Sequence, residues 1–280
     1  MKMKKFENIL IASDIDGTIL WESKYIHPRN LEKLRYFCDN GGHFALSTGR
    51  NHLDIFRVTK NLEQFVNAPC ILCNGSYLYD KEHDAIINAQ YLNNDRILQL
   101  FYDIKDLFDG VGFRASFAQG FLCATENPII LEQLRDWGLE KLAIVRPLAE
   151  FANEKLFKAA LLCDDTEKLA RLQDYIIRNY SDTFTVTTSG KTIMEVQPLG
   201  VSKKTQIIHL KEMYPSCELW CIGDFHNDVE MLLGADVAVC PENAVDAVKE
   251  ISHLQVCHCR DGAVADMIDM IERKLDQNKG

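Results

Sequence analysis

The stretch ILIASDIDGT, residues 9–18, contains the features from which the fold can be predicted. Its apolar residues 9–12 form a short uninterrupted run, which is typical of a strand buried in a parallel sheet. Two carboxylates, Asp14 and Asp16, follow, and Gly17 allows the chain to turn sharply behind them. Because alternate residues of a strand point the same way, the sequence predicts paired carboxylates at the carboxyl end of a strand, where parallel sheets bind ligands.

The two carboxylates suggest catalysis, although a simpler structure also fits them. One carboxylate can attack a substrate while the other transfers protons, and a divalent cation between them would offset their charges. The alternative is an exposed Asp-Gly turn, which is common after strands. With each of the four fixed residue types at roughly 5% of a typical sequence, a chance match in this chain has odds of about 0.002. The catalytic interpretation is therefore favoured.

Strand and helix patterns alternate along the first and last parts of the chain. The apolar runs HFALSTGR (43–50) and PCILCNG (69–75) indicate strands, and residues with helical spacing of apolar side chains separate them. The same rhythm returns from residue 201 to an amphipathic helix that ends near residue 275. Such alternation predicts a parallel sheet covered by helices on both faces.

The middle of the chain, residues 84–192, has a different pattern. Its helical patterns at 93–109 and 166–180 are long, and several strand candidates lie between and after them. This mixture predicts a separate α+β unit. We therefore expect an α/β domain formed by residues 1–83 and 193–280, interrupted by an inserted α+β domain formed by residues 84–192.

Charge and apolar runs exclude several classes of function. The net charge of −10 argues against binding to nucleic acid without sequence preference and against binding to an anionic membrane, since both need clustered Lys and Arg. The apolar run at residues 9–12 is shorter than the roughly 7–15 residues of a signal peptide. No run approaches the roughly 18 apolar residues of a membrane span. We expect a cytoplasmic protein, a monomer or homodimer, with a small-molecule partner.

Ten cysteines raise the question of a metal or redox site. Cys70 and Cys73 have CxxC spacing, and Cys257-His258-Cys259 resembles half a metal site. A zinc site would need a second pair at suitable spacing. Most of the ten lie instead in apolar runs, where free cysteine behaves as a small buried hydrophobic residue. Reduced, structural thiols are therefore expected.

Ser47-Thr48-Gly49-Arg50 also follows an apolar strand. A hydroxyl and free backbone N–H groups at a glycine turn can hold phosphate oxygens. Thr48 is the better candidate because it adjoins Gly49, although a contribution from Ser47 stays open. Alone the pattern is weak, since a strand followed by Ser or Thr and Gly is common.

Two further candidates lie in the last part of the chain. Lys203 stands near a helix start, where the helix dipole disfavours a cation, so an anionic partner is plausible beside the alternative of a solvated lysine. Asp224 follows the strand ELWCI and is a hard oxygen ligand suited to Mg²⁺. Asn227 and Asp228 begin the next helix and could simply cap it. His226 is best explained as a solvated loop residue.

Taken together and in this order, DIDGT, STGR, GVSK and GDFHND resemble the motifs of the haloacid dehalogenase superfamily, specifically the Cof-type phosphatases with a C2B cap. The resemblance covers residues 1–83 and 193–280, and the insert has the size of the cap. It implies a Rossmann-like parallel-sheet core with an inserted α+β cap domain. It also implies a Mg²⁺-dependent phosphatase that acts on small phosphorylated metabolites such as sugar phosphates.

The resemblance also implies a role for each motif residue. Asp14 would attack phosphorus and form an aspartyl-phosphate, and Asp16 would serve as general acid and then base. The phosphoryl oxygens would be held by the N–H of Ile15 and by Thr48, Gly49, Lys203 and Asn227. Mg²⁺ would be coordinated by Asp14, the Asp16 carbonyl and Asp224, with Asp228 supporting these ligands from behind.

Two other functions remain open at this point. A phosphomutase would use the same aspartyl-phosphate but return the phosphoryl group to a sugar, and a phosphate-ligand sensor would lack catalysis. A sensor would be expected to lose Asp14 or Asp16, and both are present. The insert's Arg114, Ser116 and Lys191 lie near strand ends and could reach a leaving group, although surface roles are commoner for such residues. The identity of the phosphate ester stays open.

Overall fold

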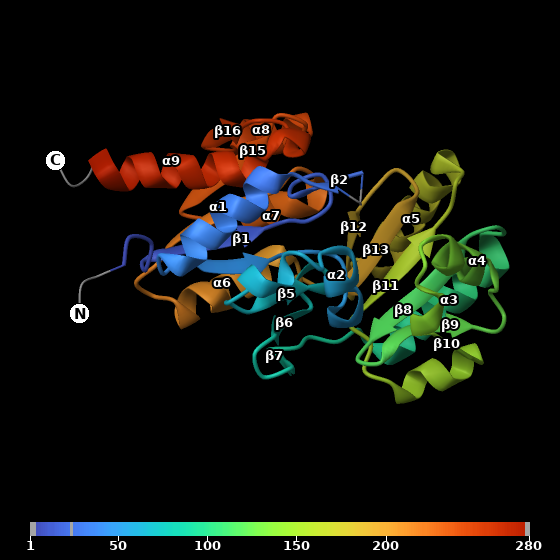
Figure 1. Ribbon diagram of the computed structural model, residues 1–280. Coiled ribbons are helices and arrows are strands. Elements are labelled where there is room, and N and C mark those ends of the chain that lie inside the picture. Colours follow the sequence, from blue (N-terminus) through green and yellow to red (C-terminus); the bar gives the residue numbers. More distant parts are fainter. Residues whose placement is uncertain (1–3, 23–24, 278–280) are drawn as a thin grey trace.

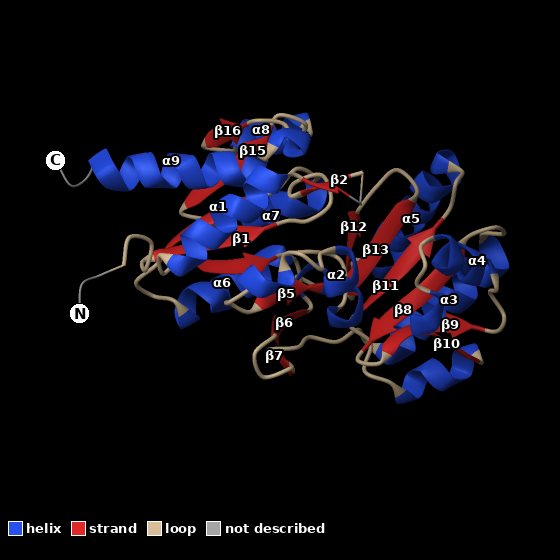
Figure 2. Cartoon of the chain, viewed as in Figure 1, coloured by secondary structure: helices blue, strands red, loops and turns tan. Residues whose placement is uncertain are grey.

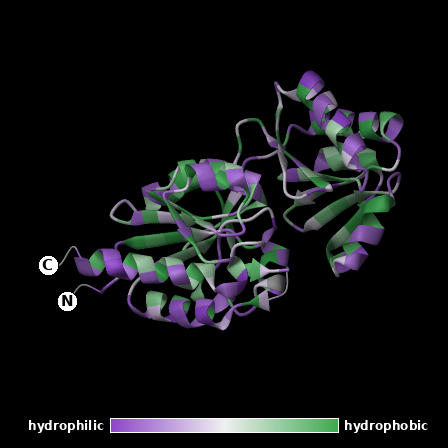
Figure 3. Ribbon diagram, turned by 90° about the horizontal axis from the view of Figure 1, so that it is seen from above, coloured by the Kyte–Doolittle hydropathy of each residue, from purple (hydrophilic) through white to green (hydrophobic). Residues whose placement is uncertain are grey.

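The structure is a computed structural model that describes residues 4–22 and 25–277. Within these residues the chain builds two large sheets, each with helices packed on it, that lie side by side (Figures 1 and 2). Hydrophobic residues gather along the strands of both parts, whereas the helices carry both kinds (Figure 3). Each sheet therefore has an apolar interior of its own.

The first sheet is parallel throughout and contains the stretch that begins the chain. Its strand order is β16 (Leu254–Val256), β15 (Val237–Pro241), β14 (Glu218–Ile222), β1 (Ile9–Ser13) and β4 (His43–Leu46). β1 lies between β4 and β14 and is buried along its whole length, as its continuous apolar run predicts.

Helices cover both faces of this sheet. They are α1 (Pro28–Asp39), α2 (His52–Val58), α6 (Lys203–Met213), α7 (Val229–Leu233), α8 (Asp246–Ile251) and α9 (Ala263–Gln277). Ile9 and Ile11 share an apolar cluster with α1 and α9, whereas Leu10 and Ala12 share another with α6, α7 and α8. The alternation of side chains along one strand thus distributes the chain's helices over two faces.

Smaller elements complete the first part. β2 (Leu20–Trp21) pairs with β3 (Tyr25–Ile26), and β5 (Cys70–Leu72), β6 (Tyr77–Asp80) and β7 (Ala85–Ile87) form an antiparallel sheet. Short 3₁₀ helices in the described chain span Glu63–Phe65, Cys73–Gly75, Glu140–Leu142, Leu148–Asn153, His226–Asp228 and Cys259–Asp261.

The second sheet is mixed and has six strands. Their order is β10 (Ala143–Arg146), β9 (Gly120–Ala124), β8 (Gly112–Phe117), β11 (Lys158–Leu162), β13 (Ile193–Pro198) and β12 (Phe184–Thr188). α3 (Asn94–Leu107) and α5 (Thr166–Tyr180) share an apolar cluster with Phe113 and Ala115, and α4 (Ile129–Asp136) packs with Phe121 and Ala160. The expected fold class, a parallel α/β core with an inserted α+β unit, is confirmed.

The strand pairing places the junctions differently from the expected boundaries. Residues 193–198, expected in the first part, form β13 and pair with β11 and β12 of the second sheet. Residues 85–87, expected in the insert, form β7 and pair with β6 of the first part. The reason is that both segments continue hairpins: backbone groups of β12 and β6 that would otherwise be unpaired bind their nearest strand.

The ten cysteines are all unpaired and mostly buried. Burial raises the pKa of Cys70 to about 12 and that of Cys73 to about 11, so the CxxC pair stays protonated at neutral pH. The CxxC pair is thus part of the apolar packing, in line with its apolar sequence surroundings. Among the described residues, no helix combines the length and apolarity that crossing a membrane requires.

Candidate active site

Three loops meet at one edge of the parallel sheet because the strands that precede them are neighbours. Asp14 follows β1, Thr48 and Gly49 follow β4, and Asp224 follows β14. Lys203 is the first residue of α6 and points into the same region. The residues predicted from separate motifs are thus brought together.

Lys203 holds the centre of the site through a fully buried ammonium group. Its Nζ donates to Asp14 Oδ1 and to Asp228 Oδ1, both at 2.6 Å, and to the Ser47 carbonyl at 3.0 Å. Burial disfavours the charged form, but the two carboxylates outweigh burial and raise the pKa of Lys203. The anionic partner expected for a lysine at a helix start is therefore found within the chain itself.

Asp228 fixes the loop that carries Asp224. Its Oδ2 accepts the backbone N–H groups of Asp224 at 3.0 Å and Phe225 at 3.1 Å. Gly223 is required beside it, because a Cβ there would lie 2.5 Å from Asp228 Cγ. The carboxylate of Asp228 therefore braces this loop and the lysine at once.

Thr18 belongs to the DIDGT motif, but no role was predicted for it from the sequence. Its hydroxyl donates to Asp224 Oδ1 at 2.8 Å. Gly17, with φ of +87°, turns the chain so closely past Asp224 that a Cβ would meet its Oδ2 at 2.3 Å. Ile15 is buried, and its carbonyl accepts the N–H groups of Ile19 and Leu20, which closes the same turn.

The acidic residues fit a small, hard cation. Ligand oxygens of Asp14, Asp224 and Asp228 lie within 4.8 Å of one another. Lys203 binds one oxygen of Asp14, and Thr18 binds one oxygen of Asp224. The other oxygen of each carboxylate accepts no hydrogen bond among the described residues. Both oxygens of Asp228 are engaged. The donor set thus suits Mg²⁺ with Asp14 and Asp224 as ligands and Asp228 behind them.

Electrostatics at this edge also favour a cation. Burial, followed by the nearby Asp228 carboxylate, raises the pKa of Asp14 well above its usual value despite Lys203. The same two causes raise the pKa of Asp224 to about 7. Three buried carboxylates around one ammonium leave excess negative charge, which a divalent cation would compensate.

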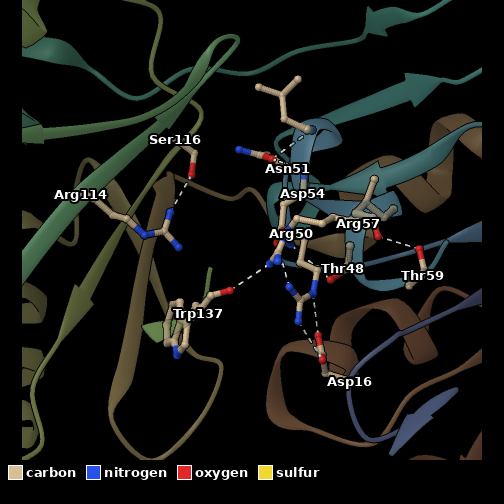
Figure 4. Close-up of polar contacts among 12 residues, drawn as sticks. Asp16, Thr48, Arg50, Asn51, Asp54, Arg57, Thr59, Arg114, Ser116 and Trp137 are labelled. Atoms are coloured by element: carbon tan, nitrogen blue, oxygen red, sulfur yellow. Dashed lines mark hydrogen bonds and ion pairs between the residues drawn. The ribbon is translucent and has the colours of Figure 1, made fainter. Parts of the chain in front are cut away.

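Asp16 turns toward Arg50 (Figure 4). Nε and Nη2 of Arg50 reach the two oxygens of Asp16, each at 3.0 Å, and Nη1 reaches Asp54 at 2.8 Å. Asp54 also accepts Arg57 Nε at 3.1 Å, and Arg57 Nη2 donates to the Trp137 carbonyl of the insert at 3.2 Å. A chain of charged groups thus joins Asp16 to the second part of the molecule.

A second polar path joins the two parts through Asn74. Asn227 Nδ2 donates to Asn74 Oδ1 at 3.2 Å, and Asn74 in turn donates to Glu195 of β13. Glu195 also pairs with Lys158 of β11. Asn74 has φ of +53° in the turn after β5. Asn227 therefore has a partner in the site as well as a place at a helix start.

A cavity of about 770 Å³ lies between the strand-end loops and the second sheet. From the first part it is lined by Asp14, Asp16, Thr48, Gly49, Asp224 and Asn227. From the insert it is lined by Arg114, Phe121, Lys158, Ala160, Leu162 and Glu195. The lining residues of β8, β11 and β13 alternate with those that face α3 and α5, as the two-residue period of a strand requires.

The remaining candidates from the sequence differ in their position relative to this cavity. Lys191 is exposed and does not line it, and Ser116 is buried beside Arg114. His226 is exposed, in line with a solvated loop residue. Thr48 lines the cavity, whereas Ser47 contributes its carbonyl to Lys203 and its hydroxyl has no partner among the described residues.

The chain thus has a parallel α/β core whose acidic strand-end loops face an inserted sheet across a cavity. A family model described as haloacid dehalogenase-like hydrolase matches residues 11–268. The chain therefore belongs to the haloacid dehalogenase-like hydrolases, as its motifs predicted, and it is an enzyme.

Curated relatives cover nearly the whole chain. A 5-amino-6-(5-phospho-D-ribitylamino)uracil phosphatase of Bacillus subtilis is 24% identical over 93% of this chain and 97% of its own length. A pyridoxal phosphate phosphatase of Escherichia coli is 25% identical over 88% of this chain and 92% of its own.

Solved structures agree on the fold. A haloacid dehalogenase-like hydrolase of Bacteroides thetaiotaomicron superposes with a TM-score of 0.78 at 22% identity, covering 94% of this chain and 99% of that one. A HAD/COF-like hydrolase of Plasmodium vivax gives 0.80 at 19% identity over 98% and 97% of the two chains. Both likenesses support the two-part architecture described above.

Proposed function

We propose that this chain is a Mg²⁺-dependent phosphatase that hydrolyses small phosphomonoesters through an aspartyl-phosphate on Asp14. The observation that carries the proposal is the buried Lys203 ammonium 2.6 Å from Asp14, which lines a cavity together with Asp16, Thr48 and Asn227. The phosphatase names of both curated relatives support it.

In the first half of the reaction, Asp14 attacks the phosphorus of the bound ester. A bond forms between its free carboxylate oxygen and phosphorus while the bond to the leaving oxygen breaks. Asp16, released from Arg50 and protonated when the substrate is bound, gives that oxygen its proton. In the second half, water attacks the same phosphorus, Asp16 takes the water's proton, and inorganic phosphate leaves with Asp14 restored.

The surrounding residues position and neutralise these groups. Lys203 holds one oxygen of Asp14, which directs the other oxygen toward the cavity, and its charge offsets that of the phosphoryl oxygens. Thr48, Gly49, Asn227 and the N–H of Ile15 donate to those oxygens. Mg²⁺, when held by Asp14, the Asp16 carbonyl and Asp224, supplies positive charge next to the phosphoryl group.

The remaining expectations belong to this proposal. We infer that the insert, expected at residues 84–192 but without β7 and with β13 added, acts as a cap over the phosphate site. The substrate is a sugar phosphate or a similar phosphomonoester, and the ten unpaired thiols support a cytoplasmic location. A phosphomutase would use the same Asp14, but it would return the phosphoryl group to a sugar without releasing phosphate.

A screen of phosphomonoesters with and without Mg²⁺ tests this function. The wild-type chain should release inorganic phosphate from at least one ester only with Mg²⁺, and Asp14→Asn should lower the rate at least about a thousandfold while its circular dichroism spectrum is unchanged. Phosphate exchange between sugar positions without release would favour the mutase. Mg²⁺-dependent turnover by Asp14→Asn would disprove the role of Asp14.

A further inference from the structure

Arg114 is a buried cation without a carboxylate partner among the described residues. It lies on β8 and lines the cavity, and only 8% of its surface is exposed. Its Nη1 makes a long hydrogen bond of 3.4 Å to the Ser116 hydroxyl, and its Nε has no partner in the described part of the chain. A buried charge left in this way is costly, which indicates a ligand.

The other cations that line the cavity are different. Arg50, Arg57 and Lys158 each lie within salt-bridge distance of a carboxylate. Glu195, the carboxylate whose charge acts most strongly on Arg114, is already engaged by Lys158 and Asn74. The positive charge of Arg114 is therefore left for whatever enters the cavity.

The guanidinium is also arranged for a planar contact. Its central carbon lies 3.9 Å from the centre of the Phe121 ring, so the ring supports it. Figure 4 shows the side chain extending from the insert toward the side on which Arg50 and Asp16 lie. A guanidinium held in this way can donate two parallel N–H groups to a carboxylate or a phosphate.

The cavity surface between Arg114 and the proposed phosphate site is apolar on the side of the insert. Phe121, Ala160 and Leu162 offer apolar surface beside Arg114, while the proposed phosphate site lies on the opposite wall. A substrate that fills the cavity would place a carbon skeleton against this surface and its far end near the guanidinium.

We propose that Arg114 binds an anionic group at the far end of the leaving group, so that the preferred substrates are phosphomonoesters with a second phosphate or a carboxylate. This inference rests on the proposed function, because it takes the leaving group to occupy the cavity. It assigns Arg114 as a specificity-determining residue.

Turnover of matched esters tests the inference. The substrates are alkyl phosphates of increasing chain length, each ending in a methyl, a carboxylate or a phosphonate group. The carboxylate end and the phosphonate end, which stands for a second phosphate, distinguish the two kinds of anion. At the best length, wild-type kcat/KM should be roughly 10- to 100-fold higher for one of the anionic ends than for methyl. Arg114→Met should bring this ratio near one, and Arg114→Lys should keep part of it. Arg171→Met, a change at an exposed arginine of α5, should keep the wild-type ratio.

Binding provides the readout that turnover does not. In calorimetry, Asp14→Asn should bind the anion-ended compounds more tightly than the methyl-ended ones. The double variant Asp14→Asn/Arg114→Lys should reduce that difference in affinity, and it serves as the test if Arg114→Met does not fold. Equal binding of all three ends, or an unchanged preference after loss of Arg114, overturns the inference. An Arg114-dependent preference in a chain that releases no phosphate supports it and contradicts only the proposed function.

Discussion

At the scale of single residues, the site depends on a balance between one ammonium and several carboxylates. Lys203→Met removes the ammonium and leaves Asp14 and Asp228 buried without a counter-charge. The free energy of unfolding should fall by about 3–5 kcal/mol in urea denaturation, and phosphatase activity should be lost.

The neighbouring lysine is a matched control for this change. Lys204 lies 3.7 Å from Glu230 on the surface, so Lys204→Met should change the free energy of unfolding by no more than about 0.5 kcal/mol. Similar losses in both variants would mean that the buried contacts of Lys203 contribute no special stability.

The raised pKa of Asp224 predicts that the stability of the folded chain depends on pH when Mg²⁺ is absent. Its pKa in the folded chain is raised to about 7, above the ordinary value of 3.8, so the folded state binds this proton more tightly than the unfolded state. Its contribution is therefore fully present below the ordinary value and is lost as pH rises toward 7. The melting temperature, measured across this range in EDTA, should show a falling contribution that Asp224→Asn lacks.

Mg²⁺ should act most strongly where that contribution has been lost. Since metal ligands bind as carboxylates, Mg²⁺ should raise the melting temperature more near pH 7 than near pH 5. An equal rise at both values, or an unchanged effect in Asp224→Asn, would speak against Asp224 as a ligand.

The positions of the main candidates could be predicted because they depend on backbone topology. Asp14, Thr48 and Asp224 each follow a strand of one parallel sheet, and such strands end at the same edge. Partners that depend on side-chain direction could not be predicted. The contact of Arg50 with Asp16, and the lack of a carboxylate partner for Arg114 among the described residues, arise only when loops and strands distant in sequence are packed together.

At the scale of elements, the turn after β1 is the most constrained. Gly17→Ala would require a side chain at φ of +87° and a Cβ 2.3 Å from Asp224 Oδ2. The free energy of unfolding should fall by about 1–3 kcal/mol, with a displaced Asp224 lowering the affinity for Mg²⁺. Chemical denaturation and Mg²⁺ titration measure the two effects.

Gly190→Ala is the control for this substitution. A Cβ at Gly190 meets nothing within 4 Å, so stability should stay within about 0.5 kcal/mol of the wild type. If Gly17→Ala were equally mild, the close approach to Asp224 would not be required for the fold or the site.

The alternation of strands and helices was sufficient to predict the parallel core. It did not predict the residues at which the insert begins and ends. β13 has a strand pattern that would suit either sheet, and only its pairing with β11 and β12 assigns it. Sequence periodicity identifies a strand but does not specify its neighbour.

At the scale of the whole molecule, Arg57 connects the core to the insert. Arg57→Met removes the hydrogen bond to the Trp137 carbonyl, so the insert should close less firmly over the substrate. KM for the best phosphomonoester should rise by about two- to tenfold. Lys60→Met, an exposed change just beyond α2, should leave KM unaltered, and equal KM values for all three proteins would contradict a role for this contact.

The most direct test of the proposed mechanism is to look for the phosphoryl group on Asp14. Wild-type protein, mixed with its best phosphomonoester and Mg²⁺ and quenched rapidly in acid, should yield a peptide covering residues 9–18 with one phosphoryl group on Asp14 in mass spectrometry. The modification should appear and decay at rates consistent with turnover, and it should be absent from Asp14→Asn. Turnover by wild-type protein with no phosphorylated Asp14, or with the phosphoryl group on another residue, would contradict the proposal.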